Sequence, residues 1–162
     1  MSEDISNVAF TELAKKTAVV TVTATDGPAP DWVKFSMAAK YSADGKQDKD
    51  ELIFDYKAGE FEVTFKLVDN SSLGLSFIPC FKETMWVQIE GTCPPVAPGD
   101  GGGVIAPVSW SKKELVVTNS NVFSETLIFM LRFDGKSKNG KNPPHQYDPK
   151  IVNGGNGQTR AN

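Results

Sequence analysis

The sequence predicts an all-β fold, an antiparallel β-sandwich with about nine or ten strands. Two observations predict it. Apolar and polar residues alternate with a period of two over most of the chain, which is the pattern of half-buried strands. Turn-forming residues interrupt this alternation at roughly regular intervals, which is typical of a sandwich or a barrel. A chain of 162 residues is also long enough to bury the core of one domain.

The first half of the chain carries the clearest alternation. In the segment 61–67, four apolar side chains alternate with Glu62, Thr64 and Lys66, so one face of this strand is expected in the core. Similar alternation predicts strands over the four segments 17–25, 32–41, 52–56 and 73–77. The polar residues 42–50 are predicted to form a loop.

The second half alternates less regularly but still predicts strands. The expected strands are 85–89, 104–110, 115–118, 127–133 and 146–152. Pro107 has no backbone N–H to donate, so its strand is expected at a sheet edge. Both faces of 127–133 are largely apolar, which predicts a central and well-covered strand. The Pro/Gly-rich residues 93–103 are predicted to be a flexible connection.

One domain is expected, with a short extension at each end. Residues 1–16 are predicted to be an N-terminal arm or a short helix, because Phe10 and Leu13 fall on one helical face while an extended arm fits nearly as well. Residues 17–153 form the β-sandwich domain, and the polar, glycine-rich residues 154–162 form a flexible tail. The arm either packs on its own domain or reaches across to another subunit.

The composition excludes several classes of partner. The net charge of −3 comes from 17 basic and 20 acidic residues, so the basic surface that nucleic acids require is not expected. No apolar run approaches the ~20 residues of a membrane helix, so no membrane partner is expected. Residues 1–7 contain neither a basic nor an apolar leader region, which predicts a cytoplasmic location. In that compartment Cys80 and Cys93 are expected to stay reduced, whereas an exported protein would allow them to pair.

No residue pattern predicts catalysis, a metal or a cofactor. His145 is the only histidine and is expected in a loop, satisfied by water or backbone; a dyad with Cys80 or Cys93 is the alternative. The segment 44–51 holds four carboxylates, but it departs from the helix–loop–helix calcium motif, so a solvated hairpin loop is expected. The glycine run 99–103 lacks the lysine and the helix of a phosphate-binding loop. We therefore expect a protein that is not an enzyme and binds no metal or cofactor.

Three tryptophans are the candidate residues for binding a ligand or a partner: Trp32, Trp86 and Trp110. Each lies out of phase with the apolar face of its predicted strand, or at a strand end. An exposed indole in such a position can anchor a partner or stack on a sugar. The alternative is packing in the core or at a sheet edge, which is the more frequent role of tryptophan.

The C-terminal part of the chain resembles a known family. The residues Leu-Arg-Phe-Asp-Gly at 131–135 and Tyr-Asp-Pro-Lys-Ile-Val-Asn-Gly-Gly at 147–155 carry the resemblance. They are similar to the last two strands of small bacterial β-sandwich proteins of the DP-EP family, which close with a Tyr-Asp-Pro-x-Ile-x-Asn segment. The second acidic–proline pair of that family is absent from this sequence. The resemblance implies an immunoglobulin-like sandwich of bacterial origin, and it implies no activity.

Two functions are expected from these observations. The first is a non-enzymatic interaction or assembly module that works through sheet edges or an aromatic patch. Edge strands offer unpaired backbone groups, so the partner is another protein or a second copy of the chain, which would give a homo-oligomer. The alternative is a small-ligand binding protein, for a carbohydrate, that uses the loops 42–50 and 93–103 beside a tryptophan platform.

Overall fold

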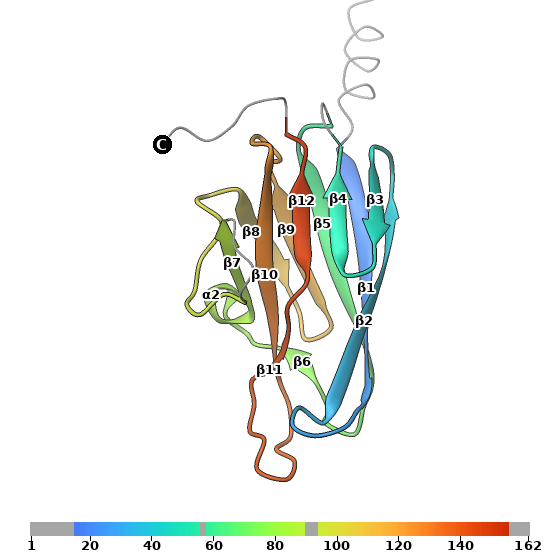
Figure 1. Cartoon of the computed structure of the whole chain (residues 1–162), viewed down its shortest axis with the longest axis vertical. Helices are drawn as coiled ribbons and strands as arrows, with labels where there is room; N and C mark the ends of the chain where they lie inside the picture. The colour runs from blue at the N-terminus through green and yellow to red at the C-terminus, as the bar shows by residue number, and fades with distance from the viewer. Residues whose placement is uncertain (1–14, 56–57, 90–93, 156–162) are drawn as a thin grey trace, which may run out of the picture.

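The computed structural model describes residues 15–55, 58–89 and 94–155, and these residues consist mainly of β-strands (Figure 1). The strands form two sheets that lie face to face. One helix is present in the described residues, α2 (Phe81–Thr84), and it has only four residues. The prediction of an all-β fold is confirmed.

The first sheet contains five strands in the order β2-β1-β5-β9-β8. Its members are β1 (Lys16–Asp26), β2 (Val33–Tyr41), β5 (Phe61–Asn70), β8 (Ile105–Trp110) and β9 (Glu114–Asn119). The predicted alternation holds here, because every second residue of β1 from Ala18 to Ala24 is fully buried. Pro107 lies on β8, which is an edge strand as predicted.

The second sheet is built around one long strand, β10. Its strand order is β11-β10-β12-β4-β3, and β6 and β7 also pair with β10. Its members are β3 (Gly45–Asp48), β4 (Glu51–Phe54), β6 (Ser76–Phe77), β7 (Met85–Ile89), β10 (Glu125–Asp134), β11 (His145–Tyr147) and β12 (Lys150–Asn153). Leu131 of β10 pairs with Met85 on one side and Tyr147 on the other, which confirms that this strand is central.

The expectation that all strands are antiparallel is wrong. The strand β1 pairs with β5 in parallel, and β12 pairs with β4 in parallel. Parallel neighbours need a connection that crosses over between them. Between β1 and β5 the chain runs back along β2 and then forms the hairpin of β3 and β4 in the other sheet. It therefore re-enters the first sheet in the direction of β1.

The number of strands also differs from the expectation, because twelve are present in the described residues. The segment 42–50, expected to be a loop, contains β3 and the turn of the β3–β4 hairpin. The expected strand 146–152 is divided into β11 and β12 at Asp148 and Pro149. A proline there removes a backbone donor and restricts the residue before it, which interrupts regular pairing.

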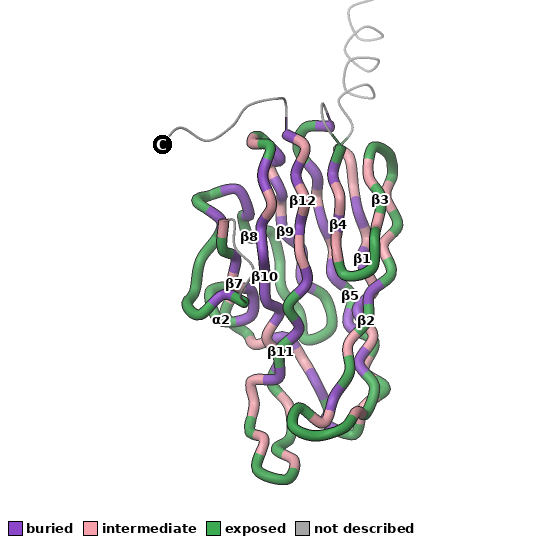
Figure 2. The backbone as a smooth tube through the Cα atoms, viewed as in Figure 1, coloured by how far each residue is buried: buried purple, intermediate pink, exposed green. Residues whose placement is uncertain are grey.

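Aromatic rings from both sheets meet in the core. Phe65 of β5 lies 5.7 Å from Phe129 of β10, measured between ring centroids. Phe54 of β4 meets Phe61 of β5 edge-on at 4.8 Å. Such ring pairs stabilise a core beyond their buried area. Figure 2 shows buried segments along the strands and mostly exposed segments at the loops between them.

One side of the sandwich is closed by the side chain of Gln47 on β3. Its Oε1 accepts a hydrogen bond from the backbone N–H of Ala39 at 2.7 Å, and its Nε2 donates to the carbonyl of Met37 at 2.7 Å. Ala39 and Met37 lie on the edge strand β2. The amide therefore satisfies edge groups of one sheet from the other sheet, and β2 offers fewer free groups to a further strand.

A buried pair of asparagine side chains joins the sheets at another point. The amides of Asn119 on β9 and Asn153 on β12 donate to each other's oxygens, at 2.8 and 2.9 Å. The same end of β12 is fixed by Gly154 and Gly155, whose N–H groups donate to the Phe54 carbonyl and to Asn121 Oδ1. These two glycines are therefore anchored and do not belong to a flexible tail.

The structure describes only part of the two segments that were predicted to flank the domain. Lys16 is the first residue of β1, next to the expected domain start at residue 17. The rest of the predicted arm, 1–14, and the rest of the predicted tail, 156–162, lie outside the described residues.

The asparagine pair gives a prediction about stability. We expect Asn153→Ala to lower the free energy of unfolding by about 1–3 kcal/mol, because it leaves the buried amide of Asn119 without its partner. Urea unfolding followed by circular dichroism measures the change, and the exposed residue Asn142 provides the control Asn142→Ala. Equal stability of both variants would contradict a structural role for the pair.

Candidate functional site

A hollow of about 490 Å³ lies between the edge strand β8 of one sheet and α2 and β7 of the other, and we call it the side hollow. Five of its lining residues have apolar side chains. It is lined by Phe81, Lys82, Met85, Pro98, Gly99, Asp100, Ile105 and Pro107. Preformed apolar hollows with a few polar groups are the usual form of binding sites.

The backbone of Gly99 and Asp100 spans the two sheets beside the side hollow. The N–H of Val87 on β7 donates to the Gly99 carbonyl at 2.8 Å, and the N–H of Ile105 on β8 donates to the Asp100 carbonyl at 3.1 Å. The next three residues, 101–103, have φ angles of 68°, 69° and 88°, a region that glycine enters without steric cost. The glycine run thus follows a hydrogen-bonded path between the sheets, where a flexible connection was expected.

The short helix α2 is held in place by two side chains. Thr84 Oγ1 donates to the Arg132 carbonyl at 2.7 Å and accepts from the N–H of Ile78 at 3.0 Å. Arg132 Nη1 donates to the carbonyl of Glu83 at 2.9 Å and to its carboxylate at 3.1 Å. Because a four-residue helix is not stable alone, these bonds to β10 hold α2 in place and with it Phe81, which lines the side hollow.

Trp86 is covered by the same arginine. The guanidinium carbon of Arg132 lies 3.8 Å from the centre of the indole ring, which is a cation–π contact. The indole is half-buried, and its Nε1 is buried without a hydrogen-bond partner among the described residues. Trp86 was a candidate binding residue because it lies off the core face of its strand. Arg132 covers one face of this ring, which leaves less of the indole for a partner.

Trp110 lies on β8, the edge strand whose residues Ile105 and Pro107 line the side hollow. It pairs with Leu115 across the β8–β9 ladder, as Pro107 pairs with Val117, and directly paired residues point to the same face of a sheet. Both partners are buried in the core, so Trp110 and Pro107 face the same side of β8. Trp110 is nevertheless 39% exposed, and Val108 beside it is 52% exposed.

Trp32 lies apart from the other two, between β1 and β2. Its φ of 64° is unusual for a bulky residue, and it is fixed by hydrogen bonds between Trp32 and the backbone of Gly27 and Pro28. The ammonium of Lys138 lies 5.7 Å from the ring centre. The three tryptophans thus belong to three different places and do not form one platform.

The two loops expected to share a ligand site lie at opposite edges of the molecule. Residues 42–50 belong to the β3 edge of the second sheet, whereas 94–103 lie beside β7 and β8 (Figure 1). Two of the four carboxylates of 44–51 already have partners within the chain. Asp44 forms an ion pair with Lys16 at 2.9 Å, and Asp50 accepts a hydrogen bond from the Tyr147 hydroxyl at 2.6 Å. The expectation that both loops form a single site is therefore wrong.

Of the residues considered for catalysis, the described part of the chain contains His145 and Cys80, and no hydrogen bond joins these two. His145 lies on β11 and is fully buried, so its expected place in a loop is wrong, although its hydrogen bond goes to backbone as expected. Cys80 is an exposed free thiol in the turn before α2, whereas Cys93 lies outside the described residues. Within 15–55, 58–89 and 94–155, no group of three or more His, Cys, Asp or Glu side chains is arranged to hold a metal.

Sequence reasoning did not find most residues of the side hollow. Met85 belongs to a predicted strand, Phe81 lies between two predicted strands, and Asp100 sits in a run that was expected to be flexible. They converge with Ile105 only because β7 and β8 become neighbours across the two sheets. The exposed apolar residues Val108 and Trp110 on an edge strand were the one local signal.

The comparisons with known proteins assign neither a family nor a function. No protein-family model matches the chain, and no curated protein matches it. Among solved structures, the chain is similar to the inclusion body protein PixA from Burkholderia cenocepacia, with 8% sequence identity and a TM-score of 0.36. That similarity covers 87% of this chain and 97% of the other. The resemblance to the DP-EP family stays a prediction.

In the described part of the chain, no helix has the length and apolar character needed to cross a membrane.

The anchoring of α2 can be tested with Arg132. We expect Arg132→Met to lower the free energy of unfolding by about 1–3 kcal/mol, because its long side chain still covers Trp86 but no longer bonds to Glu83. Glu83→Gln is the matched control, since it keeps the backbone bond and removes only the exposed ion pair, which is worth about 0–1 kcal/mol. Urea unfolding followed by Trp emission measures both. A larger loss in Glu83→Gln would contradict the anchoring role.

Proposed function

We propose that the chain is a non-enzymatic assembly module that forms a symmetric dimer through the side hollow. The observation that carries the proposal is the uncovered apolar surface around this hollow. Val96 is 88% exposed, Val108 52% and Trp110 39%, and all three belong to the loop or the edge strand that frames it. Exposed apolar groups gathered at one place are typical of an interaction surface.

The edge strands β8 and β2 are protected against pairing with a further strand. This favours a partner that packs its side chains against the molecule. On β8, the N–H of Ile105 is taken by Asp100, Pro107 has no N–H, and the register shifts between Pro107 and Ser109. Proline and bulges on an edge oppose pairing with a further strand. On the opposite side of the molecule, Gln47 covers β2. A partner is therefore expected to insert apolar side chains into the side hollow.

The charges at the side hollow favour a second copy as that partner. Lys82 lines the hollow from α2, and Asp100 lines it from the segment that spans the sheets. In a dimer with two-fold symmetry, every contact between two different residues occurs twice. Lys82 of one copy can therefore face Asp100 of the other, while Asp100 of the first copy faces Lys82 of the second. A surface with one positive and one negative group around an apolar centre is self-complementary in this sense.

Two further properties belong to this proposal. We propose an immunoglobulin-like sandwich, supported by two facing sheets and a chain that crosses between them. We also propose a cytoplasmic location, supported by the exposed free thiol of Cys80, which suits a reducing compartment.

The mass in solution tests the dimer. We expect a dimer in size-exclusion chromatography with light scattering, and a monomer for Val108→Glu, because a buried carboxylate without a partner is unfavourable in such an interface. The control is Val122→Glu, which places the same charge on another exposed valine, 39% exposed in the loop between β9 and β10 and outside β8 and the segment 94–103.

Three results of this experiment would contradict different parts of the proposal. A dimer that persists in Val108→Glu would contradict the assignment of the interface to this side of the molecule. A wild-type chain that stays monomeric at high concentration would contradict self-association, and dissociation by Val122→Glu alone would place the interface elsewhere.

A further inference from the structure

Val96 is the most exposed of the large apolar residues in the described part of the chain. It is 88% exposed, whereas the next of these residues, Val108, is 52% exposed. Val96 belongs to the segment that follows β7 and runs beside β7 and β8 (Figure 1). A single exposed valine is ordinary on a protein surface, whereas one that is fixed beside a recess is suited to a contact.

Three prolines stiffen the segment that carries Val96. The residues 94–98 read Pro-Pro-Val-Ala-Pro, and each proline fixes its own φ angle and restricts the residue before it. Pro95, directly before Val96, is buried, and the Gly99 carbonyl accepts a hydrogen bond from the Val87 N–H at 2.8 Å. Val96 is therefore held between two anchored points while it stays exposed. A residue that is already ordered loses little entropy when a partner covers it.

The same segment places Val96 close to the side hollow. Pro98 lines the hollow, and two residues of fully extended chain span at most about 7 Å. The Cα atom of Val96 therefore lies within that distance of the Cα atom of a residue in the wall. One surface of the molecule thus carries an exposed apolar side chain and, next to it, an apolar recess.

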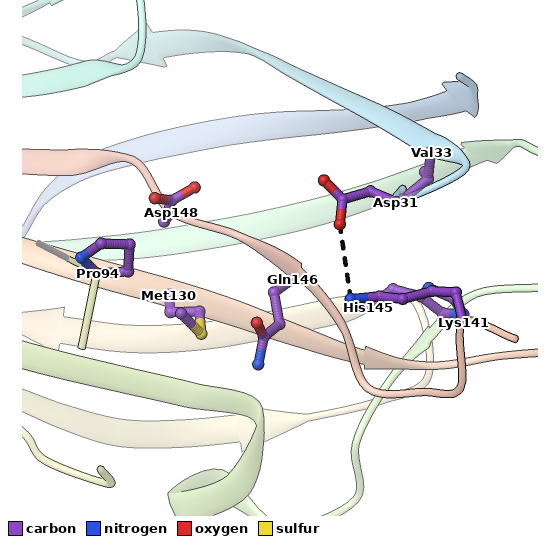
Figure 3. Close-up of a pocket in the computed structure, with 8 residues that line it drawn as sticks. All are labelled: Asp31, Val33, Pro94, Met130, Lys141, His145, Gln146 and Asp148. Carbon is purple, nitrogen blue, oxygen red and sulfur yellow. Dashed lines mark ion pairs between the residues drawn. The ribbon is translucent and has the colours of Figure 1, made fainter. Parts of the chain in front are cut away.

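The chemistry of the side hollow fits a valine better than that of the pocket at the other end of the segment. Pro94 lines that second pocket, whose walls also carry the carboxylates of Asp31 and Asp148 (Figure 3). Asp31 forms an ion pair with Lys141 at 3.5 Å, drawn there as a dashed line. A valine in that pocket would remove charged groups from water without pairing them, which is unfavourable. The side hollow, with five apolar lining residues, carries no such penalty over most of its wall.

Two-fold symmetry can bring the valine of one copy to the hollow of the other. The axis of such a dimer lies in the plane of the interface, and the same patch of both copies forms the contact. When the axis bisects the line between Val96 and the hollow at a right angle, Val96 of each copy lies over the hollow of its partner. The contact then closes on itself and does not continue into a filament.

We propose that Val96 of each copy enters the side hollow of the partner copy, where it packs against Phe81 and Pro107. This inference rests on the dimer proposed above and specifies which side chain fills the hollow. Each dimer then buries two valines that the single chain leaves exposed. Apolar surface removed from water in this way stabilises the association.

Two substitutions at Val96 test its contribution to the dimer. Val96→Ala removes buried methyl groups, and Val96→Thr keeps the shape of the side chain but adds a hydroxyl group. We expect each to raise the Kd of the dimer at least about tenfold, because every change acts twice in a symmetric contact. Light scattering over a range of concentrations measures the Kd, and Val122→Ala and Val122→Thr are the matched controls. Equal Kd values for the substitutions at Val96 and at Val122 would overturn the proposal, even where the wild-type chain dimerises and Val108→Glu dissociates it.

A double-mutant cycle tests whether the hollow is the place that receives Val96. Phe81→Leu reshapes the wall of the hollow, so we expect Val96→Ala to weaken the Phe81→Leu dimer by a factor that differs at least about twofold from its effect on the wild-type dimer. Independent effects of the two substitutions would place Val96 elsewhere in the interface and overturn its insertion. A wild-type chain that stays monomeric would contradict the dimer itself, and the two failures are therefore distinguishable.

Discussion

The contacts between aromatic rings of the two sheets are the constraint on which the rest of the structure depends. They join β2, β4, β5, β10 and β11, as in the stacking of Phe35 on Phe133 and on Tyr147 at 5.3 Å. Rings of this size fix the separation of the layers and bury much of the apolar surface that stabilises the fold. Toward β7 and β8, the facing residues are Met85, Ile105 and Pro107, and there the side hollow remains.

The two sides of the sandwich consequently differ in chemistry. At β2 and β3, Gln47 bonds directly to the neighbouring edge, so the two sheets are joined by a side chain. At β7 and β8, the sheets are joined through the backbone of Gly99 and Asp100, and apolar side chains stay exposed around that connection. This asymmetry is why we assign the interaction surface to the β8 side.

Much of the fold could be predicted from the sequence, because strands with one buried face alternate in a way that is local. The core positions of β1, β2 and β5 follow this rule, and so does the covered strand β10. The parallel pairs could not be predicted, since they depend on where the chain crosses between sheets. The site was harder to predict for the same reason. Trp86 does lie off the core face, but Arg132 from a distant segment covers it.

The central claim is that the chain self-associates through the β8 side of the sandwich and not through the β2 side. Hydrogen–deuterium exchange of the whole protein, measured at low and at high concentration, tests it most directly. We expect exchange to slow at high concentration in 81–85 and 96–110 only, because these residues lie in or beside the side hollow. Slowing that is confined to β2 and β3, or exchange that does not change with concentration anywhere, would contradict the claim.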